Sequence, residues 1–392
     1  MKTVFQILLA APLFANPPSH AQSLTERDTL LEDWGGLRSH LAEKGLSFEL
    51  VYTAEYFENL NGGINEGGDY RGDISLFATL DTSTAGWWDN GEFFLHLQQQ
   101  HGEGITERYT GDFQVLSNID ADDYLQISEI WYRHTFASDR AWLKIGKMES
   151  NADFAFVDYA AEFLNSSPGF SPTIPLTTYP DQDWGIVLGL QPNDRFSVNM
   201  GVYQGRPNGG HAIGTTIDNL YGPMVMIEPA LHYDFNNKPG HLRFGAWWNG
   251  DHVEDVDGSG KIHDSSEGIY LTWDQELISE NDEDEQGLGI FAQLGFSDED
   301  TAEAKNYYGA GLQWTGPVDN RDEDILGFGI FHVELSDEAG FAEDNETTLE
   351  LYYKAQLTPW SSIKPDIQYI ANPGGTTNDD ALAIGARLEI LF

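Results

Sequence analysis

The sequence is distinguished first by what it lacks, because it contains no cysteine and few basic residues. Without cysteine there is neither a disulfide nor a thiol nucleophile. A secreted chain of this size then depends for stability on a large core or on a closed hydrogen-bond ladder. Only 20 Lys and Arg residues stand against 64 Asp and Glu residues, which gives a formal net charge of -44. This balance excludes a nucleic-acid partner, which requires a basic surface.

Long hydrophobic runs are also missing after the N-terminus. Lys2, the apolar run Val4–Ala15 and the small residues Ser19 and Ala21 predict a secretory signal peptide over residues 1–21, cleaved after Ala21. No later segment approaches the 18 apolar residues of a transmembrane helix. The mean hydropathy of -0.40 fits a soluble protein and a membrane barrel equally. In a barrel the lipid-facing apolar residues alternate with polar residues along each strand, so the average stays low.

Residues 22–45 have helical spacing, unlike the rest of the chain. Leu30, Trp34, Leu37 and Leu41 fall on one helical face between Glu26 and Lys44, and Gly45 ends the pattern. We expect a short amphipathic helix, an N-terminal periplasmic segment that packs on the near end of the following domain.

From Leu46 to Phe392 the apolar residues alternate with polar or small ones in segments of about ten residues. In Ala381–Phe392 one face carries Leu382, Ile384, Leu388 and Phe392, and the other carries Arg387 and Glu389. A strand of this length suits a tilted bilayer crossing, with the apolar face toward lipid and the charged face toward a wet lumen. We count about sixteen such segments. The prediction is an all-β fold, a transmembrane antiparallel β-barrel over residues 46–392.

The links between these segments alternate in length. Links after even-numbered strands are brief (TAGWWDN, ASDR, PNDR, NNKPG and TPWSS), whereas most of the others are longer, and the link between Met148 and Trp184 is the longest. Outer-membrane barrels have short periplasmic turns and long outer loops. Two links, ISENDEDEQ and GPVDNRDED, exceed the expected turn length. A soluble sandwich gives no reason for loops to sort by parity.

An ordered series of short motifs runs through nearly all of the mature chain. It includes Asp33-Trp34-Gly35-Gly36-Leu37-Arg38, Ser128-Glu129-Ile130-Trp131-Tyr132, Gln356-Leu357-Thr358-Pro359-Trp360 and Asn372-Pro373-Gly374-Gly375. With this series the sequence resembles the carbohydrate-selective porins of the OprB type. The resemblance implies a sixteen-stranded channel of the bacterial outer membrane that passes glucose and similar sugars.

A porin needs a polar constriction, and the Met148–Trp184 link is the candidate to fold inward, since it carries both acids and aromatics. Charged side chains can bind sugar hydroxyls, while an indole face can support the apolar side of the ring. Strand parity, or a place beside an early outer loop, gives these candidate pore-lining residues: Glu129, Trp131, Arg133, Arg243, Trp247, Glu350, Lys354, Arg387, Glu389, Arg71 and Arg108. The alternative for each charged pair is a brace within the barrel wall.

Metal and enzyme signals are weak. Asp255–Ile262 resembles the start of a calcium loop, but Ser266 stands where the twelfth-position acid is expected, so an acidic outer loop is the favoured interpretation. The GxSxG, HExxH and GxxxxGK[ST] motifs are absent. We therefore expect a passive sugar porin, not an enzyme, with no cofactor, in contact with outer-membrane lipid, as a monomer or a homotrimer. The alternatives are a general or cation-preferring porin, an outer-membrane hydrolase and a soluble secreted binding protein.

Overall fold

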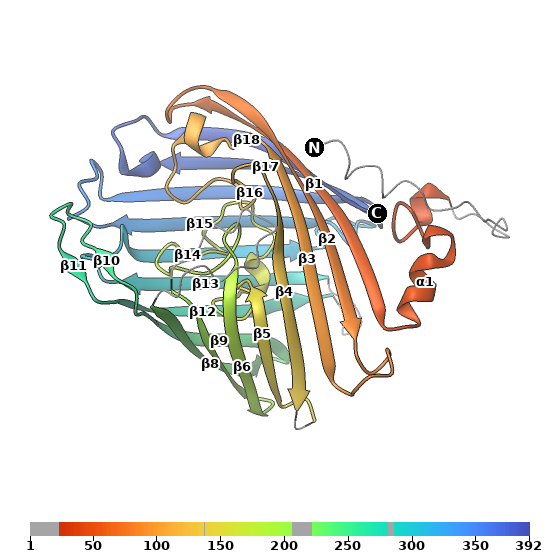
Figure 1. Ribbon diagram of the computed structural model, residues 1–392. Helices are drawn as coiled ribbons and strands as arrows, with labels where there is room; N and C mark the ends of the chain where they lie inside the picture. Colours follow the sequence, from red (N-terminus) through yellow and green to blue (C-terminus); the bar gives the residue numbers. More distant parts are fainter. Residues whose placement is uncertain (1–22, 137, 206–221, 281–285) are drawn as a thin grey trace.

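The computed structural model describes residues 23–136, 138–205, 222–280 and 286–392, so the predicted signal peptide lies outside the described residues. Within these ranges sixteen antiparallel strands form one closed barrel, which confirms the predicted fold (Figure 1). The barrel strands are β1 (Leu46–Asn61), β2 (Gly67–Asp81), β3 (Gly91–Gly102), β4 (Tyr124–Phe136), β5 (Ala141–Met148), β6 (Asp183–Asn193), β7 (Phe196–Gln204), β8 (Pro223–Phe235), β9 (Lys238–Asn249), β12 (Ser266–Ser279), β13 (Gly287–Ser297), β14 (Ala304–Thr315), β15 (Ile325–Leu335), β16 (Asn345–Thr358), β17 (Ser361–Ala371) and β18 (Ala381–Leu391).

The barrel closes where β1 pairs with β18, in a register that runs from Val51 opposite Leu391 to Asn61 opposite Leu382. The amide of Phe392 also donates to the carbonyl of Leu50 at 2.9 Å. Because each barrel strand of the described residues has two neighbours, the barrel has no open strand edge, as a lipid environment requires.

Residues alternate between the two faces of the wall as the sequence predicts. In β18, Ala381 and Ala383 are fully buried and Arg387 is 6% exposed on the inner side, whereas Ile384 is 40% exposed on the outer side. Tyr56 of β1 is likewise exposed on the outside. The apolar face therefore points outward and the small or charged face points into the lumen.

A β-bulge in β4 changes the parity of one strand. The pairing shifts between His96 opposite Glu129 and Leu97 opposite Ile127, so that Ser128 is the extra residue. Ser128 donates to Gln98 at 2.7 Å and Glu129 accepts from the amide of Glu149 at 3.2 Å, so both side chains are directed inward. Glu129 is thus on the side of the wall that its parity predicts.

The two ends of the barrel differ, and we call them the turn end and the loop end. Links at the turn end include residues 194–195, 236–237 and 359–360. Asn236 and Asn237 both have positive φ (54° and 61°), which suits a tight two-residue hairpin turn. The loop end carries residues 103–123, 149–182 and 250–265, the last including the hairpin of β10 (Val253–Glu254) and β11 (Ile262–His263). The prediction that short and long links alternate between the two ends is therefore confirmed. The link 316–324 is an exception, because it lies at the turn end but is long, as its sequence indicates.

Outward-facing aromatic side chains gather at the turn end. Trp87, Trp88 and Phe93 are all exposed, and Trp88 Nε1 donates to the hydroxyl of Tyr132 at 2.8 Å. Phe93 and Tyr132 rings lie 4.7 Å apart. Aromatic rings with a polar edge favour the boundary between lipid and water, so this cluster marks one membrane interface.

The N-terminal helix is present but shorter than the Glu26–Lys44 pattern predicts. The helical pieces before the barrel are η1 (Leu24–Glu26), η2 (Trp34–Gly36) and the six-residue α1 (Leu37–Ala42). Gly35 and Gly36 have φ values of 70° and 93°, which no right-handed helix accommodates, so α1 begins only after them. The amide of Leu30 donates to the carbonyl of Leu391 at 2.9 Å, which places this segment beside the turn end (Figure 1). No helix in the described ranges is long and apolar enough to cross a membrane.

The orientation of the wall predicts an asymmetric cost of charge. Leu388→Arg places a charge on the lipid side of β18 and should lower the free energy of unfolding by about 2–4 kcal/mol near the bilayer midplane. Thr79→Arg, which faces an open cavity on the inner side of β2, is the matched control and should cost much less. Urea unfolding in lipid vesicles measures both values. Equal losses would contradict the assignment of faces.

Candidate functional site

The loop of residues 149–182 folds into the barrel lumen, as the sequence predicts (Figure 1). Phe154 and Leu164 are fully buried and Phe163 is 1% exposed, although all three belong to a loop. The loop contains the short helical turn η4 (Asp158–Ala160). Its apolar side chains therefore face the interior of the barrel and not the outer solvent.

Two apolar clusters hold this loop against two adjoining parts of the wall. Phe154 lies in a cluster with wall residues of β6 to β12, namely Val187, Tyr203, Met224, Met226, Trp247 and Tyr270. Phe163 packs edge-on against Phe291, Phe331 and Tyr352, with ring centroids 5.0–5.6 Å apart. The loop thus spans the lumen and narrows it.

Wall carboxylates fix the backbone of the same loop. Glu350 accepts hydrogen bonds from the amides of Leu164 at 2.6 Å and Asn165 at 3.0 Å. Glu228 accepts from the amide of Ala155 and from the hydroxyl of Tyr270, both at 2.7 Å. These acids satisfy loop amides that the fold has removed from water.

A second loop, residues 103–123 with the helical turn η3 (Thr106–Thr110), also enters the lumen. Glu346 accepts from the amides of Phe113 at 2.6 Å and Gln114 at 2.9 Å. The loop joins the first one, since Asn118 N donates to Leu164 O at 2.7 Å and Ser166 N donates to Val115 O at 3.0 Å. We call residues 103–123 and 149–182 the paired loops.

The sequence interpretation missed this second loop because it considered only the longest link. The available signal is the apolar content of the segment, which includes Ile105, Phe113, Val115 and Leu116. Leu116 is fully buried and Ile105 is 4% exposed. A link that exposed these side chains to outer solvent would lose the free energy of burying them.

Glu162, in the longer of the paired loops, lies between two wall lysines. Its carboxylate is 2.7 Å from Lys354 Nζ and 2.5 Å from Lys364 Nζ. Burial by itself would raise the pKa of Glu162, but the two ammonium groups lower it to about 2. The loop is therefore bound to β16 and β17 by two ion pairs as well as by apolar packing.

Two arginines bind the shorter of the paired loops. Arg387 donates to Glu55 at 2.9 and 3.0 Å and to the side-chain oxygen of Asn118 at 2.7 Å. Arg71 lies 2.8 Å from Asp120 and donates to the carbonyl of Ala121. Both arginines, selected from the sequence as pore-lining residues, thus contact loop groups from the wall.

The Glu129, Trp131 and Arg133 group lies on the lumen side of β4. Trp131 Nε1 donates to Glu129 at 3.2 Å, and the guanidinium of Arg133 lies 4.7 Å from the ring of Trp142. Within the described ranges no carboxylate lies at ion-pair distance from Arg133. Its contact with a solute stays a prediction, and a brace between Glu129 and Arg133 is not what the geometry favours.

The remaining candidates divide by accessibility. Glu350 is fully buried and Trp247 is 4% exposed in an apolar cluster, so these two have little surface to offer a solute. Arg243 forms an ion pair with Asp274 and lies 3.7 Å from Asp158 of the longer loop. Lys354 lies 3.6 Å from Glu389, whose side chain is 33% exposed. Direct solute contact by these residues stays a prediction.

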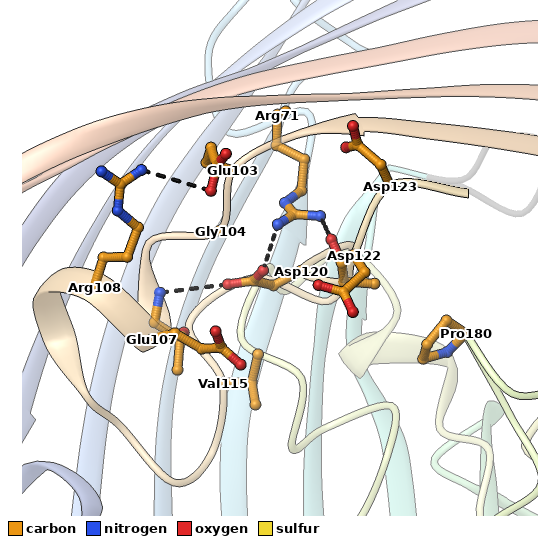
Figure 2. A pocket seen from close by; sticks show the side chains of 13 residues that line it. Arg71, Glu103, Gly104, Glu107, Arg108, Val115, Asp120, Asp122, Asp123 and Pro180 are labelled. Atoms are coloured by element: carbon orange, nitrogen blue, oxygen red, sulfur yellow. Dashed lines mark hydrogen bonds and ion pairs between the residues drawn. The ribbon is translucent and has the colours of Figure 1, made fainter. Parts of the chain in front are cut away.

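A cavity of about 550 Å³ lies at the loop end beside the shorter of the paired loops (Figure 2). Arg71 and Arg108, the two arginines selected near early outer loops, both line it. Figure 2 shows Arg71 directed at Asp120 and Arg108 directed at Glu103, with 3.5 Å between the charged atoms of the latter pair. Burial raises the pKa of Asp120 to about 6, although the guanidinium of Arg71 opposes this. The cavity offers donors and acceptors at the mouth of the lumen.

The Asp255–Ile262 segment fits calcium poorly. The Asp255 carboxylate already lies 3.3 Å from Lys261 Nζ and 3.1 Å from His263 Nε2, and Asp257 accepts from the amide of Ser259 at 2.7 Å. Calcium requires six to eight oxygen ligands. Here the Asp255 carboxylate is already paired with the Lys261 ammonium group. Asp158, His241 and Asp274 could in principle hold a metal ion, but the guanidinium of Arg243 lies among them. Calcium binding stays a prediction that this geometry disfavours.

A closed barrel with an apolar outer band, short turns at one end and inward loops at the other defines a porin of the bacterial outer membrane. The sequence matches the family described as carbohydrate-selective porin, OprB family, over residues 65–392. The chain belongs to this family.

Individual relatives agree with this assignment. Porin B of Pseudomonas aeruginosa is 26% identical, with 93% of this chain and 91% of that protein covered. The putative porin QuiX of Acinetobacter baylyi is 25% identical, with 94% of each covered. The high-pH structure of Pseudomonas putida OprB has a TM-score of 0.86 at 24% identity and covers 95% of this chain and 100% of that chain, which supports the fold.

The Glu162 contacts predict an acid-dependent loss of stability. Because the folded-state pKa of Glu162 is about 2, below its ordinary 4.5, its stabilising contribution is complete above pH 4.5 and is lost as pH falls toward 2. The loss should be on the order of 3 kcal/mol. Glu162→Gln should be less stable than wild type at pH 7 and should lack this part of the acid dependence.

Urea unfolding in detergent micelles at pH 7, 4.5 and 2.5, followed by tryptophan fluorescence, measures these differences. Asp194→Asn removes an exposed carboxylate, paired with Arg140 at 3.3 Å, and should keep the acid dependence of wild type. If Glu162→Gln loses as much stability as wild type between pH 4.5 and 2.5, the two lysines do not hold this carboxylate as described.

Proposed function

We propose that this protein is a passive channel for small neutral sugars of the glucose class, carrying them across the outer membrane without catalysis. The observation that supports this most is the lumen narrowed by the paired loops, where charges of both signs lie near aromatic rings. Membership of a carbohydrate-selective family and the similarity to Porin B support the same class of solute.

The mixture of signs suits polyols. Sugar hydroxyls donate to carboxylates and accept from ammonium or guanidinium groups, whereas an ion of one sign is attracted by only half of such a wall. For example, Glu162 pairs with both Lys354 and Lys364, and Lys354 also lies 3.6 Å from Glu389. Since these groups already pair with each other, a passing sugar exchanges hydrogen bonds without being held tightly, as conduction requires.

A second candidate is a general channel that prefers cations. It is favoured by the net charge of -44 and by the outer cavity, where five acids accompany only two arginines. The acids are Glu103, Glu107, Asp120, Asp122 and Asp123. Such a mouth would concentrate cations at low ionic strength.

Bilayer and vesicle measurements on the purified, refolded protein separate the two candidates. The sugar channel should admit glucose into liposomes, and added glucose or maltose should reduce single-channel ion current in a saturable way. A general channel would pass solutes according to size alone, with no saturable reduction. Release of free sugar from glycosides by the purified protein would contradict passive transport.

Arg133 provides a test of charge in the lumen. Removing one unit charge about 10 Å from the ion path changes an ion's energy by about 0.4 kcal/mol in water, or roughly a factor of two in occupancy. The loss of this positive charge favours cations and disfavours anions by about the same factor, so Arg133→Gln should raise the cation-to-anion permeability ratio about fourfold, measured as a reversal potential in a KCl gradient. Lys305→Gln removes a charge at the outer rim, where Lys305 pairs with Asp337, and should change the ratio less. An unchanged ratio in Arg133→Gln would place Arg133 away from the ion path.

A further inference from the structure

The N-terminal segment, residues 23–45, follows the rim of the turn end, and we call it the rim segment (Figure 1). Near its start, Trp360 Nε1 in the link between β16 and β17 donates to the carbonyl of Leu24 at 2.7 Å. At its end, the amide of Asp81 in β2 donates to the carbonyl of Gly45 at 2.8 Å. Between these points it also bonds to the end of β18. The rim segment is therefore fixed along the ends of neighbouring wall strands.

Aromatic residues of the membrane interface lie beside both ends of the rim segment. The link that follows Asp81 carries the exposed Trp87 and Trp88, which mark the interface at the turn end. Trp360, beside Leu24, has the same arrangement as Trp88, because its indole N–H is bonded to an oxygen while the rest of the ring is apolar. The rim segment therefore lies at the level where the lipid-facing wall meets the lipid headgroups.

Three leucines of the rim segment are exposed. Leu24, Leu31 and Leu37 have 56%, 52% and 46% of their surface exposed, and Leu351, a lipid-facing residue of β16, has 46%. A single exposed leucine is ordinary on a protein in water. Three in one short segment, next to a wall that lipid already covers, extend the apolar surface past the end of that wall.

Other apolar side chains of the rim segment are partly covered by protein. Leu30, Trp34 and Leu41 are half-buried, and the guanidinium of Arg38 lies 5.0 Å from the ring of Trp34. Leu37 shares their helical spacing in the sequence but is exposed, because the two glycines before α1 have positive φ and interrupt that spacing. The fold thus covers some apolar residues of the segment and leaves others exposed.

The charge of the rim segment indicates how it could meet a membrane. Five acids accompany three basic residues, and one of these, Arg27, already pairs with Glu32 at 2.7 Å. Membrane-surface helices that depend on anionic lipid carry Lys and Arg on their polar face. Contact between this segment and lipid would therefore depend on apolar area and not on charge.

We propose that the rim segment is a membrane-surface segment, and that Leu24, Leu31 and Leu37 insert into the phospholipid leaflet at the turn end. Their partner is the boundary between headgroups and acyl chains, about 5–10 Å deep in the leaflet. Continuity with the interface at Trp87 and Trp88 favours lipid over a protein partner. Because hydrogen bonds to the barrel already order the backbone of the segment, insertion needs only side-chain contacts.

The test uses the absence of cysteine from the chain, which allows single-cysteine variants of the refolded protein to carry one nitroxide label each. In phosphatidylcholine vesicles, labels on Leu24→Cys, Leu31→Cys and Leu37→Cys should meet dissolved oxygen more often than a water-soluble nickel chelate. Their oxygen-to-nickel accessibility ratio should be at least about threefold above that of a label on Ser39→Cys. The label on Leu351→Cys provides the ratio of a lipid-facing residue.

Ser39 is the matched control because it is exposed in the same helix, about 200° around the axis from Leu37. Ratios at the three leucine positions equal to that at Ser39 would overturn the proposal, since the leucines would then lie in water. Low access to both reagents would also overturn it, because the labels would be packed against protein, in the barrel or in a second copy. Replacing half of the lipid by phosphatidylglycerol should not raise the ratios, and a rise would contradict an apolar contact.

Discussion

The ladder between β1 and β18 is the interaction on which the rest of the structure depends. It completes the backbone hydrogen bonding of the wall, and in lipid an open edge would leave several groups without partners at a cost of several kcal/mol each. Closure also fixes the register that brings Glu55 opposite Arg387. That pair then reaches Asn118, so the position of an inner loop follows from the closing strands.

Inside the closed wall, three acidic residues act as acceptors for loop amides. Glu228, Glu346 and Glu350 each bind backbone N–H groups of the paired loops. A carboxylate can accept such a bond on each of its two oxygens, whereas an amide side chain has one oxygen and an NH2 group that only donates. Part of the acidic surplus of this chain therefore serves to shape the lumen, and it is not available to attract cations.

Much of the fold could be predicted from the sequence, because alternation identifies both the strands and their faces. Alternation does not identify what meets an inward side chain. Glu350 and Trp247 have the parity of pore-lining residues, yet Glu350 binds the backbone of a loop and Trp247 packs beneath one. The same limit applies to loop 103–123, whose partners lie far away in sequence. At the N-terminus, helical spacing predicted too long a helix, because Gly35 and Gly36 have positive φ and interrupt it.

The hydrogen bonds between the paired loops have a consequence for how such channels diverge. Asn118 and Ser166 join the two loops through backbone groups, so the conformation of each depends on the length of the other. An insertion in residues 103–123 would break contacts of residues 149–182, even where no side chain changed. The two segments should therefore vary in length together during evolution, and a graft from one porin into another would succeed only if both were exchanged as a unit.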